Sequence, residues 1–155
     1  MTPDDLIELE AIRRLKHRYV RCLDEKRWAE LEEVFTEDAV ASYGDGEFHY
    51  EGRDAILGFL TKALGDHGMI TSHRVGQEEI DLTGPGAATG TWGLSDVVII
   101  PAANMTIRGA AFYHDEYVKH DGEWRIRRTG YERLYEEREP RDTTGVQLSA
   151  NRWGA

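Results

Sequence analysis

Cysteine, proline and long apolar runs are scarce in this chain, which has one cysteine and four prolines among 155 residues. The single thiol, Cys22, cannot form an internal disulfide, and its place among apolar residues at helical spacing predicts core packing rather than a catalytic role. No stretch approaches the roughly 18 apolar residues that a membrane helix needs. The first residues also lack the basic and apolar regions of a signal peptide, so we expect a cytoplasmic protein.

Positive charge is scarce as well, because 19 lysines and arginines stand against 29 acidic residues, a formal net charge of −10. This excess argues against nucleic acid and anionic membranes as partners and favours a neutral or weakly charged small ligand. Apolar residues make up 40% of the chain and charged residues 31%, a balance typical of globular domains. No repeat or linker divides the sequence. We expect one domain over residues 1–138 and an irregular tail over residues 139–155.

Hydrophobic periodicity predicts three helices followed by a series of long strands. The helices are expected at residues 3–24, 28–35 and 53–64, and the strands at 39–43, 47–50, 71–82, 87–100, 105–119 and 123–137. Consecutive long strands joined by short turns form an antiparallel meander. The order implies an α+β fold with a cone-shaped, curved, mixed but mostly antiparallel sheet, and the helices packed on its concave face.

Four polar residues occur in stretches that otherwise have the character of protein interior: Tyr19, Asp24, His73 and Asp96. Asp96 is the clearest, because the alternate positions of its expected strand are otherwise apolar. A buried carboxylate without partners is costly, so it must be paired, neutral or used in chemistry. If the four side chains meet in one cavity, they form an acid–base site.

His73 is the candidate general base, since an imidazole accepts a proton readily near neutral pH. Asp24 is the natural partner to fix the tautomer of that ring, but no local spacing joins the two. Taken singly, His73 is better explained as a structural histidine at the start of a strand, and Asp24 as a solvent-exposed carboxylate at a helix end. The joint occurrence of the four polar residues is what favours the catalytic interpretation. Tyr19 and Asp24 lie about 140° apart around an ideal helix, so they share a site only if the helix ends near Leu23.

Tyr19 and Asp96 are candidate acids. Tyr19 could donate its phenol proton to a substrate oxygen, and its alternative is a core tyrosine with a satisfied hydroxyl. Asp96 could protonate a leaving hydroxyl if burial keeps it protonated, and its alternative is an ion pair with Arg108 or Arg133 across the sheet.

Aromatic residues at strand spacing are candidates to line an apolar pocket for a ring-shaped substrate, although such residues are equally often simple core. Arg133 is a candidate anchor for an anionic or carbonyl group. The candidate substrate-binding residues are Trp92, Tyr43, Tyr113, Tyr131 and Arg133. The other histidines lack ligand spacing with cysteine or carboxylates, so we expect neither a metal site nor a cofactor.

Five segments in this order resemble the nuclear-transport-factor-2-like superfamily and, within it, the SnoaL-like group. They are Ile-Arg-Arg-Leu-Lys-His-Arg-Tyr at 12–19, Trp-Ala-Glu-Leu-Glu-Glu-Val-Phe at 28–35, Tyr-Glu-Gly-Arg-Asp-Ala-Ile at 50–56, Ser-His-Arg-Val at 72–75, and Asp-Glu-Tyr at 115–117 followed by Asp-Gly-Glu-Trp-Arg-Ile at 121–126. The resemblance covers roughly residues 6–138. This fold supports many activities, so the resemblance specifies the fold more strongly than the function.

Two kinds of member are most similar. Bile-acid 7α-dehydratases look similar in a polar quartet that maps onto Tyr19, Asp24, His73 and Asp96. Hexachlorocyclohexane dehydrochlorinase shares the Asp24–His73 pair, but that family has Lys near Tyr19, an apolar residue at Asp96 and Arg at Thr129. These departures favour loss of water or proton transfer over halide elimination.

The resemblance implies a cofactor-free lyase, a dehydratase acting on an apolar cyclic carbonyl- or hydroxyl-bearing molecule such as a steroid or polyketide-like ring. Two alternatives remain open: an isomerase or cyclase that uses the same base, and a non-catalytic ligand-binding protein like the small subunit of ring-hydroxylating oxygenases. Relatives are often trimers or dimers, so a homo-oligomer is expected. The apolar tail residues Val146, Leu148 and Trp153 are expected to dock on the body or on a neighbouring subunit.

Overall fold

The structure is a computed structural model that describes residues 1–154. Its elements are α1 (Pro3–Asp24), α2 (Trp28–Glu32), β1 (Phe35–Tyr43), β2 (Phe48–Glu51), α3 (Arg53–Leu64), β3 (Ile70–Gly84), β4 (Ala87–Ile100), the 3₁₀ turn η1 (Pro101–Ala103), β5 (Met105–His120) and β6 (Glu123–Pro140). The helices expected at 3–24 and 53–64 are confirmed. The helix expected at 28–35 ends at Glu32, because Phe35 already pairs with Ile126 in the sheet.

Helix α1 begins with a reciprocal cap and ends where the candidate site begins. Thr2 Oγ1 accepts a hydrogen bond from the Asp5 N–H at 3.1 Å, and the Asp5 carboxylate accepts one from the Thr2 N–H at 2.7 Å. Its buried face includes Ile12, Leu15 and Tyr19. The helix stops at Asp24, which leaves that carboxylate at the end of the helix beside β3.

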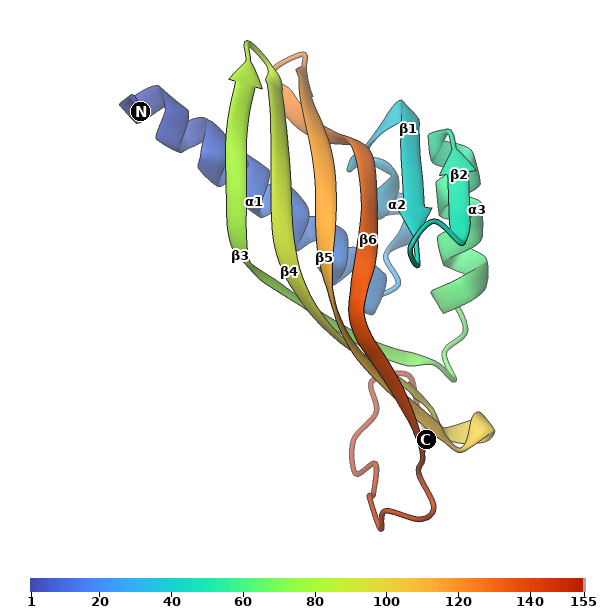
Figure 1. Ribbon diagram of the computed structural model, residues 1–155. Coiled ribbons are helices and arrows are strands. Elements are labelled where there is room, and N and C mark those ends of the chain that lie inside the picture. Colours follow the sequence, from blue (N-terminus) through green and yellow to red (C-terminus); the bar gives the residue numbers. More distant parts are fainter. Residues whose placement is uncertain (155) are drawn as a thin grey trace.

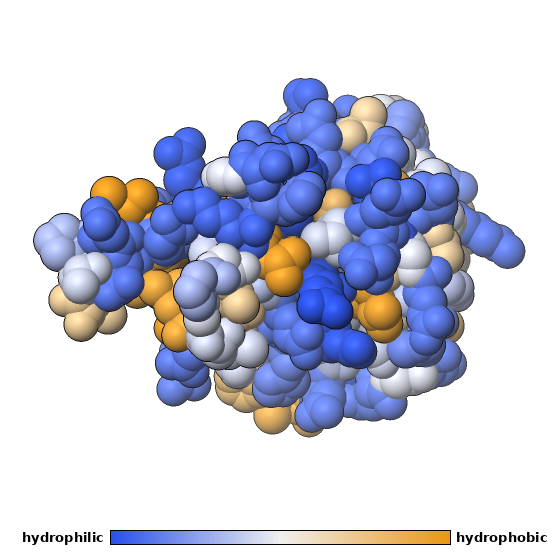
Figure 2. All heavy atoms as spheres, turned by 90° about the horizontal axis from the view of Figure 1, so that it is seen from above, coloured by the Kyte–Doolittle hydropathy of each residue, from blue (hydrophilic) through white to orange (hydrophobic). Residues whose placement is uncertain are grey.

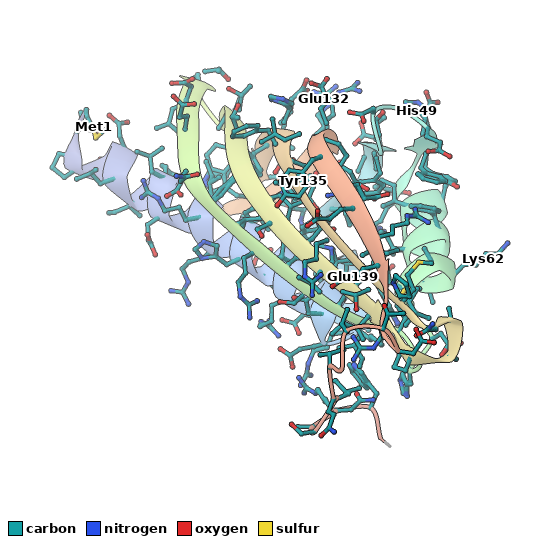
Figure 3. The ribbon with its side chains drawn as sticks, turned by 60° about the horizontal axis from the view of Figure 1, so that its bottom comes forward. Met1, His49, Lys62, Glu132, Tyr135 and Glu139 are labelled. Atoms are coloured by element: carbon teal, nitrogen blue, oxygen red, sulfur yellow. The ribbon has the colours of Figure 1, made fainter. Side chains whose placement is uncertain are left out.

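Six strands form one open, mixed sheet in the order β2-β1-β6-β5-β4-β3. All neighbours are antiparallel except β1 and β6, which are parallel. Figure 1 shows α1 crossing behind the curved sheet, with α3 beside β1 and β2. The expected α+β architecture is confirmed. In Figure 3, α3, which carries Lys62, lies at the opposite end of the molecule from Met1.

Alternate residues of the strands face α1 and form the core. On β4 these are Trp92, Leu94 and Asp96, all nearly inaccessible, as the alternation of the sequence predicts. Bulges in β3 and β6 shift this alternation by one residue along each strand. Hydrophilic residues cover most of the surface visible in Figure 2, with apolar residues scattered among them. Among residues 1–154, no helix combines the length and apolar character needed to span a membrane.

The segment after β6 runs back along the body without regular structure. Val146 and Leu148 are exposed, whereas Trp153 stacks on His67 with ring centroids 4.7 Å apart. Arg152 reaches Glu25 at the end of α1, at 3.2 Å. Docking of the tail on the body is therefore confirmed for Trp153 but not for the other two apolar residues.

Candidate active site

The end of α1 and the start of β3 bring His73 and Asp24 together. His73 Nδ1 lies 2.7 Å from Asp24 Oδ1, and the two side chains are largely buried, at 10% and 19% exposed. Because a carboxylate only accepts hydrogen bonds, Nδ1 is the donor, and in the neutral ring Nε2 carries the lone pair. Among residues 1–154, no hydrogen-bond partner contacts Nε2. The ring is thus oriented on one side and unengaged on the other, as a general base requires.

Asp24 is held by two further donors from β3. Thr71 Oγ1 donates to Oδ1 at 2.9 Å, and the backbone N–H of His73 donates to Oδ2 at 2.8 Å. The carboxylate therefore joins the helix end to the strand and fixes the imidazole at the same time.

His73 and Asp24 are among the residues that line a groove of about 640 Å³ between α1 and the edge strand β3. This volume is in the range of small-molecule sites. Apolar lining comes from Val20 on α1, Ile70 and Val75 on β3, and Trp153 of the tail. A small organic molecule in the groove would contact His73 directly.

Asp96 lies directly across the sheet from His73, since the two are paired residues of β3 and β4 and share a face. Arg133 binds both carboxylate oxygens of Asp96, at 2.6 and 3.0 Å. Burial opposes the charge of Arg133, but the hydrogen bonds and charge of Asp96 raise the pKa of its guanidinium above the ordinary value. Both oxygens of the Asp96 carboxylate are thus engaged by one guanidinium. The structure therefore favours the ion-pair alternative for Asp96 over the role of acid.

Gly109 on β5 makes this ion pair possible. It is the β5 residue paired with Asp96, and a Cβ there would overlap the Arg133 guanidinium and lie 3.0 Å from the Tyr135 carbonyl oxygen. The bare glycine backbone leaves the space in which the arginine crosses to Asp96. Neither Asp96 nor Arg133 lines the groove, so Arg133 is not placed there as a substrate anchor.

Tyr19 is not brought to the His73–Asp24 pair. Its hydroxyl lies 2.8 Å from the Tyr43 hydroxyl, and its side chain is completely buried. Burial raises the pKa of the Tyr19 hydroxyl well above its ordinary value, which makes it a poorer proton donor. The position matches the alternative of a core tyrosine with a satisfied hydroxyl. Tyr19 and Asp24 lie on different faces of α1, and the helix continues to Asp24.

The aromatic residues expected to line a substrate pocket pack against one another instead. Tyr113 makes T-shaped, edge-to-face contacts with Tyr19 and Tyr131, and Tyr43 packs at a tilt against Tyr131. Trp92, Tyr43 and Tyr113 are core residues, and none of the four lines the groove beside His73. Tyr131 is partly buried and lies under the Arg133 guanidinium.

A second buried polar cluster, centred on Lys16 and Asp115, was not found from the sequence. Lys16 Nζ lies 2.7 Å from Asp115 Oδ2 with both side chains inaccessible, and 3.4 Å from the Tyr113 ring centroid. The Tyr117 and Thr129 hydroxyls also donate to Asp115, at 2.7 and 2.6 Å. Burial lowers the pKa of Lys16. The available signal was spacing: residue 16 is four after Ile12 on the apolar face of α1.

Among residues 1–154, no group of three or more histidine, cysteine or acidic side chains is arranged so that it could hold a metal ion.

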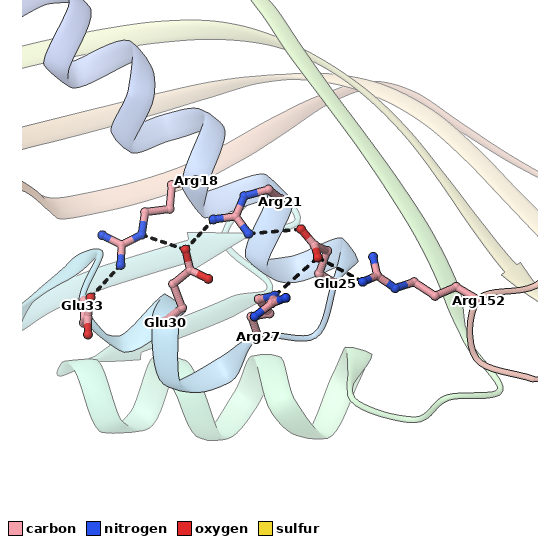
Figure 4. A network of polar contacts seen from close by, with 7 residues as sticks. All are labelled: Arg18, Arg21, Glu25, Arg27, Glu30, Glu33 and Arg152. Atoms are coloured by element: carbon pink, nitrogen blue, oxygen red, sulfur yellow. Dashed lines mark hydrogen bonds and ion pairs between the residues drawn. The ribbon is translucent and has the colours of Figure 1, made fainter.

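Charged side chains surround the outer end of the groove. Figure 4 shows Arg21 bound to Glu25 and Glu30, and Arg152 bound to Glu25. These contacts join the tail to α1 and α2. The guanidinium groups of both Arg21 and Arg152 are therefore paired with carboxylates.

Solved structures of similar fold include enzymes that eliminate small molecules. A Novosphingobium aromaticivorans protein named for scytalone dehydratase is 26% identical, with a TM-score of 0.81 over 97% of this chain and 95% of that one. A type 2 hexachlorocyclohexane dehydrochlorinase is 20% identical, with a TM-score of 0.82 over 95% and 96%. A type 3 enzyme from Novosphingobium barchaimii is 18% identical, with a TM-score of 0.81 over 95% and 97%.

At 20% and 18% sequence identity, the similarity to the two dehydrochlorinases shows the fold alone. The family is shown by a match of the SnoaL-like domain model to residues 4–130, which is most of the sequence. This agrees with the segments that carried the resemblance and with the helix and strand order. The chain belongs to the SnoaL-like domain family of the nuclear-transport-factor-2-like superfamily.

Proposed function

We propose that this protein is a cofactor-independent lyase in which His73 is the general base and Asp24 its orienting partner. The observation that carries the proposal is the 2.7 Å bond between His73 Nδ1 and Asp24, with Nε2 unengaged and both residues among those that line a groove. The substrate class that fits the apolar lining is a small cyclic molecule with a carbonyl and a hydroxyl group. Dehydration is the reaction we assign.

The reaction needs only one base in this arrangement. Nε2 takes a proton from the carbon next to the carbonyl, and the negative charge of Asp24 stabilises the imidazolium that results. The C–H electron pair becomes the new double bond as the C–O bond breaks. The imidazolium then gives its proton to the departing hydroxyl, which leaves as water. Tyr19 and Asp96 have no step in this scheme, because their side chains are bonded elsewhere.

The names of the structural neighbours support elimination chemistry. One is named for a dehydratase and two are dehydrochlorinases, so all three names refer to loss of a small molecule from a carbon skeleton. An isomerase or cyclase would use the same base without loss of water, and it stays the second candidate.

A library of cyclic hydroxyketones and hydroxysteroids, screened by mass spectrometry, tests the assignment. The proposal predicts a product lighter by one water, formed by the wild type and not by His73→Gln. A product of unchanged mass that depends on His73 would make the protein an isomerase or cyclase. Equal conversion by the wild type and His73→Gln would contradict the assignment of the base.

A further inference from the structure

We infer that the substrate of the His73 groove carries an anionic group, most simply a carboxylate, and that Arg74 binds it. This inference rests on the proposed function for the identity of the site and adds the chemical class of its substrate. It reverses the expectation, drawn from the net charge of −10, that the ligand is neutral or weakly charged.

Arg74 reaches the groove although strand alternation directs it away. His73 faces α1, so the next side chain of β3 begins on the opposite face of the sheet. Because β3 is an edge strand, a long side chain can fold around it. Arg74 Nη1 donates to the His73 carbonyl at 3.1 Å and lies 4.0 Å from Asp24 Oδ2. The guanidinium therefore lies beside the pair that would perform the chemistry.

The Arg74 guanidinium is the least engaged of the three arginines that line the groove. Arg21 and Arg152 are bound by carboxylates, whereas Arg74 is 79% exposed and has one hydrogen bond, to a backbone carbonyl. The Asp24 carboxylate beside it already accepts three closer hydrogen bonds. Most of the five N–H donors of Arg74 are thus available to a ligand.

Charge complementarity favours an anion at this place. The whole chain is strongly acidic, so most of its surface repels anions. Three arginines and two carboxylates, Asp24 and Glu25, line the groove, and Arg74 is the arginine among them that has no hydrogen bond to a carboxylate. A guanidinium also matches a carboxylate geometrically, through two parallel hydrogen bonds.

The apolar residues that line the groove indicate the kind of scaffold that carries the anionic group. Trp153, Ile70, Val75 and Val20 provide apolar contact for a ring, and Arg74 lies at the outer edge of the same groove. A ring seated against Trp153 with its carboxylate at Arg74 would present its C–H bonds toward His73. The substrate class is therefore a cyclic carboxylic acid rather than a wholly neutral ring.

Benzoate and its neutral analogue benzamide are the probes that test this inference, because they differ in charge but hardly in shape. Nitrogen-labelled protein is titrated with each probe, and the signals of the Trp153 indole and the His73 ring are followed. Benzoate is expected to shift both signals saturably and to bind more weakly as salt is raised. Arg74→Gln should weaken benzoate binding by roughly threefold to tenfold and leave benzamide unchanged.

Arg128→Gln is the matched control, because Arg128 is also an exposed strand arginine, but it lies outside the groove and is paired with Glu116. It should leave the affinity for both probes unchanged. Equal affinity for benzoate and benzamide, equal effects of the Arg74 and Arg128 variants, or benzoate binding that does not shift His73 and Trp153 would each overturn the inference. These outcomes concern binding only. Failure of the catalytic proposal would instead appear as full turnover by His73→Gln, whatever the probes show.

Discussion

The Asp24 carboxylate has a structural and a chemical task at once. It accepts hydrogen bonds from Thr71 and the His73 backbone, which tie the end of α1 to β3, and it also holds the His73 ring. Because Asp24 also joins the end of α1 to β3, the imidazole that we propose as the base is oriented before any substrate arrives. Preorganisation of this kind is what a general base needs to act at a defined carbon.

Asp24→Asn separates the two tasks. The amide has one acceptor oxygen, so at least one donor of β3 loses its partner and the free energy of unfolding falls by about 1–3 kcal/mol. The imidazolium also loses its counter-charge, so turnover should fall by about 10²–10⁴-fold. Urea unfolding and turnover of the same preparation measure both effects. Wild-type turnover in this variant would show that Asp24 is structural only.

The Asp96–Arg133 pair depends on one glycine. Gly109→Ala introduces a Cβ that overlaps the Arg133 guanidinium and lies 3.0 Å from the Tyr135 carbonyl oxygen, so the guanidinium must shift and its bidentate pairing with the buried Asp96 is disturbed. We expect a loss of about 2–4 kcal/mol in the free energy of unfolding, measured in urea. Gly76→Ala on β3 is the control, because nothing lies within 4 Å of a Cβ there. Equal stability of the two variants would contradict this account of Gly109.

At the scale of elements, α1 divides the concave face of the sheet into two parts. Its middle carries Lys16 into the sealed cluster around Asp115, and its end carries Asp24 to the groove at the edge strand. The tail closes the outer end of that groove with Trp153, held by stacking on His67 and by the neighbouring Arg152–Glu25 ion pair. The groove is therefore made of three elements that are distant in the sequence.

Trp153→Ala tests the tail as a wall of the groove. Trp153 packs on one ring at the surface, so its loss should lower the free energy of unfolding by no more than about 1 kcal/mol. It should weaken substrate binding and raise KM several-fold, with little change in kcat. Leu148→Ala, which changes an exposed apolar residue of the same tail, should leave KM unaltered. Steady-state kinetics of both variants test this prediction. Equal KM values for Trp153→Ala and Leu148→Ala would contradict the role of Trp153 as a wall of the groove.

At the scale of the whole molecule, the core holds an unusual number of buried phenols. Burial raises the pKa of Tyr19, Tyr43, Tyr113 and Tyr117 above the ordinary value near 10. In the unfolded chain these groups ionise at about pH 10, while in the native protein they stay protonated to higher pH. The unfolded state then binds fewer protons than the native state, so the free energy of unfolding falls as pH rises.

Stability should therefore be insensitive to these tyrosines below about pH 10 and should fall above it by about 1.4 kcal/mol per pH unit for each of them. Urea unfolding at a series of alkaline pH values measures the slope. The absorbance of tyrosinate from the buried groups should rise only together with unfolding. A flat stability curve across this range would show that these phenols are less buried than the structure has them.

The sequence predicts those features of the fold that follow from residue periodicity. It does not predict features that depend on which residues of neighbouring strands are paired. The long helices, the four long strands and the burial of Asp96 follow from spacing alone. The partner of Asp96 could not be chosen between Arg108 and Arg133, because a bulge in β6, opposite Ala110 and Ala111, places Arg133 on the face of Asp96. The sequence does not single out Lys16, because the ammonium group of a lysine on a helix is ordinarily expected to reach solvent even where the neighbouring residues are apolar.

The same limit applies to the candidate site. His73 and Asp24 were singled out by residue type and by family resemblance, and the structure brings them together. Tyr19 was grouped with them, although the structure directs its hydroxyl to Tyr43. The groove itself could not be foreseen, because Trp153 reaches it from the irregular tail, for which no periodicity exists.

Turnover of His73→Gln on the substrate identified by screening tests the central claim most directly, with His120→Gln as the control because its side chain is largely exposed. We predict that His73→Gln folds as the wild type does, by circular dichroism, and loses about 10²–10⁴-fold in kcat/KM, while His120→Gln keeps full activity. Retention of more than roughly a tenth of wild-type kcat/KM by a folded His73→Gln variant would contradict the claim that this imidazole is the base.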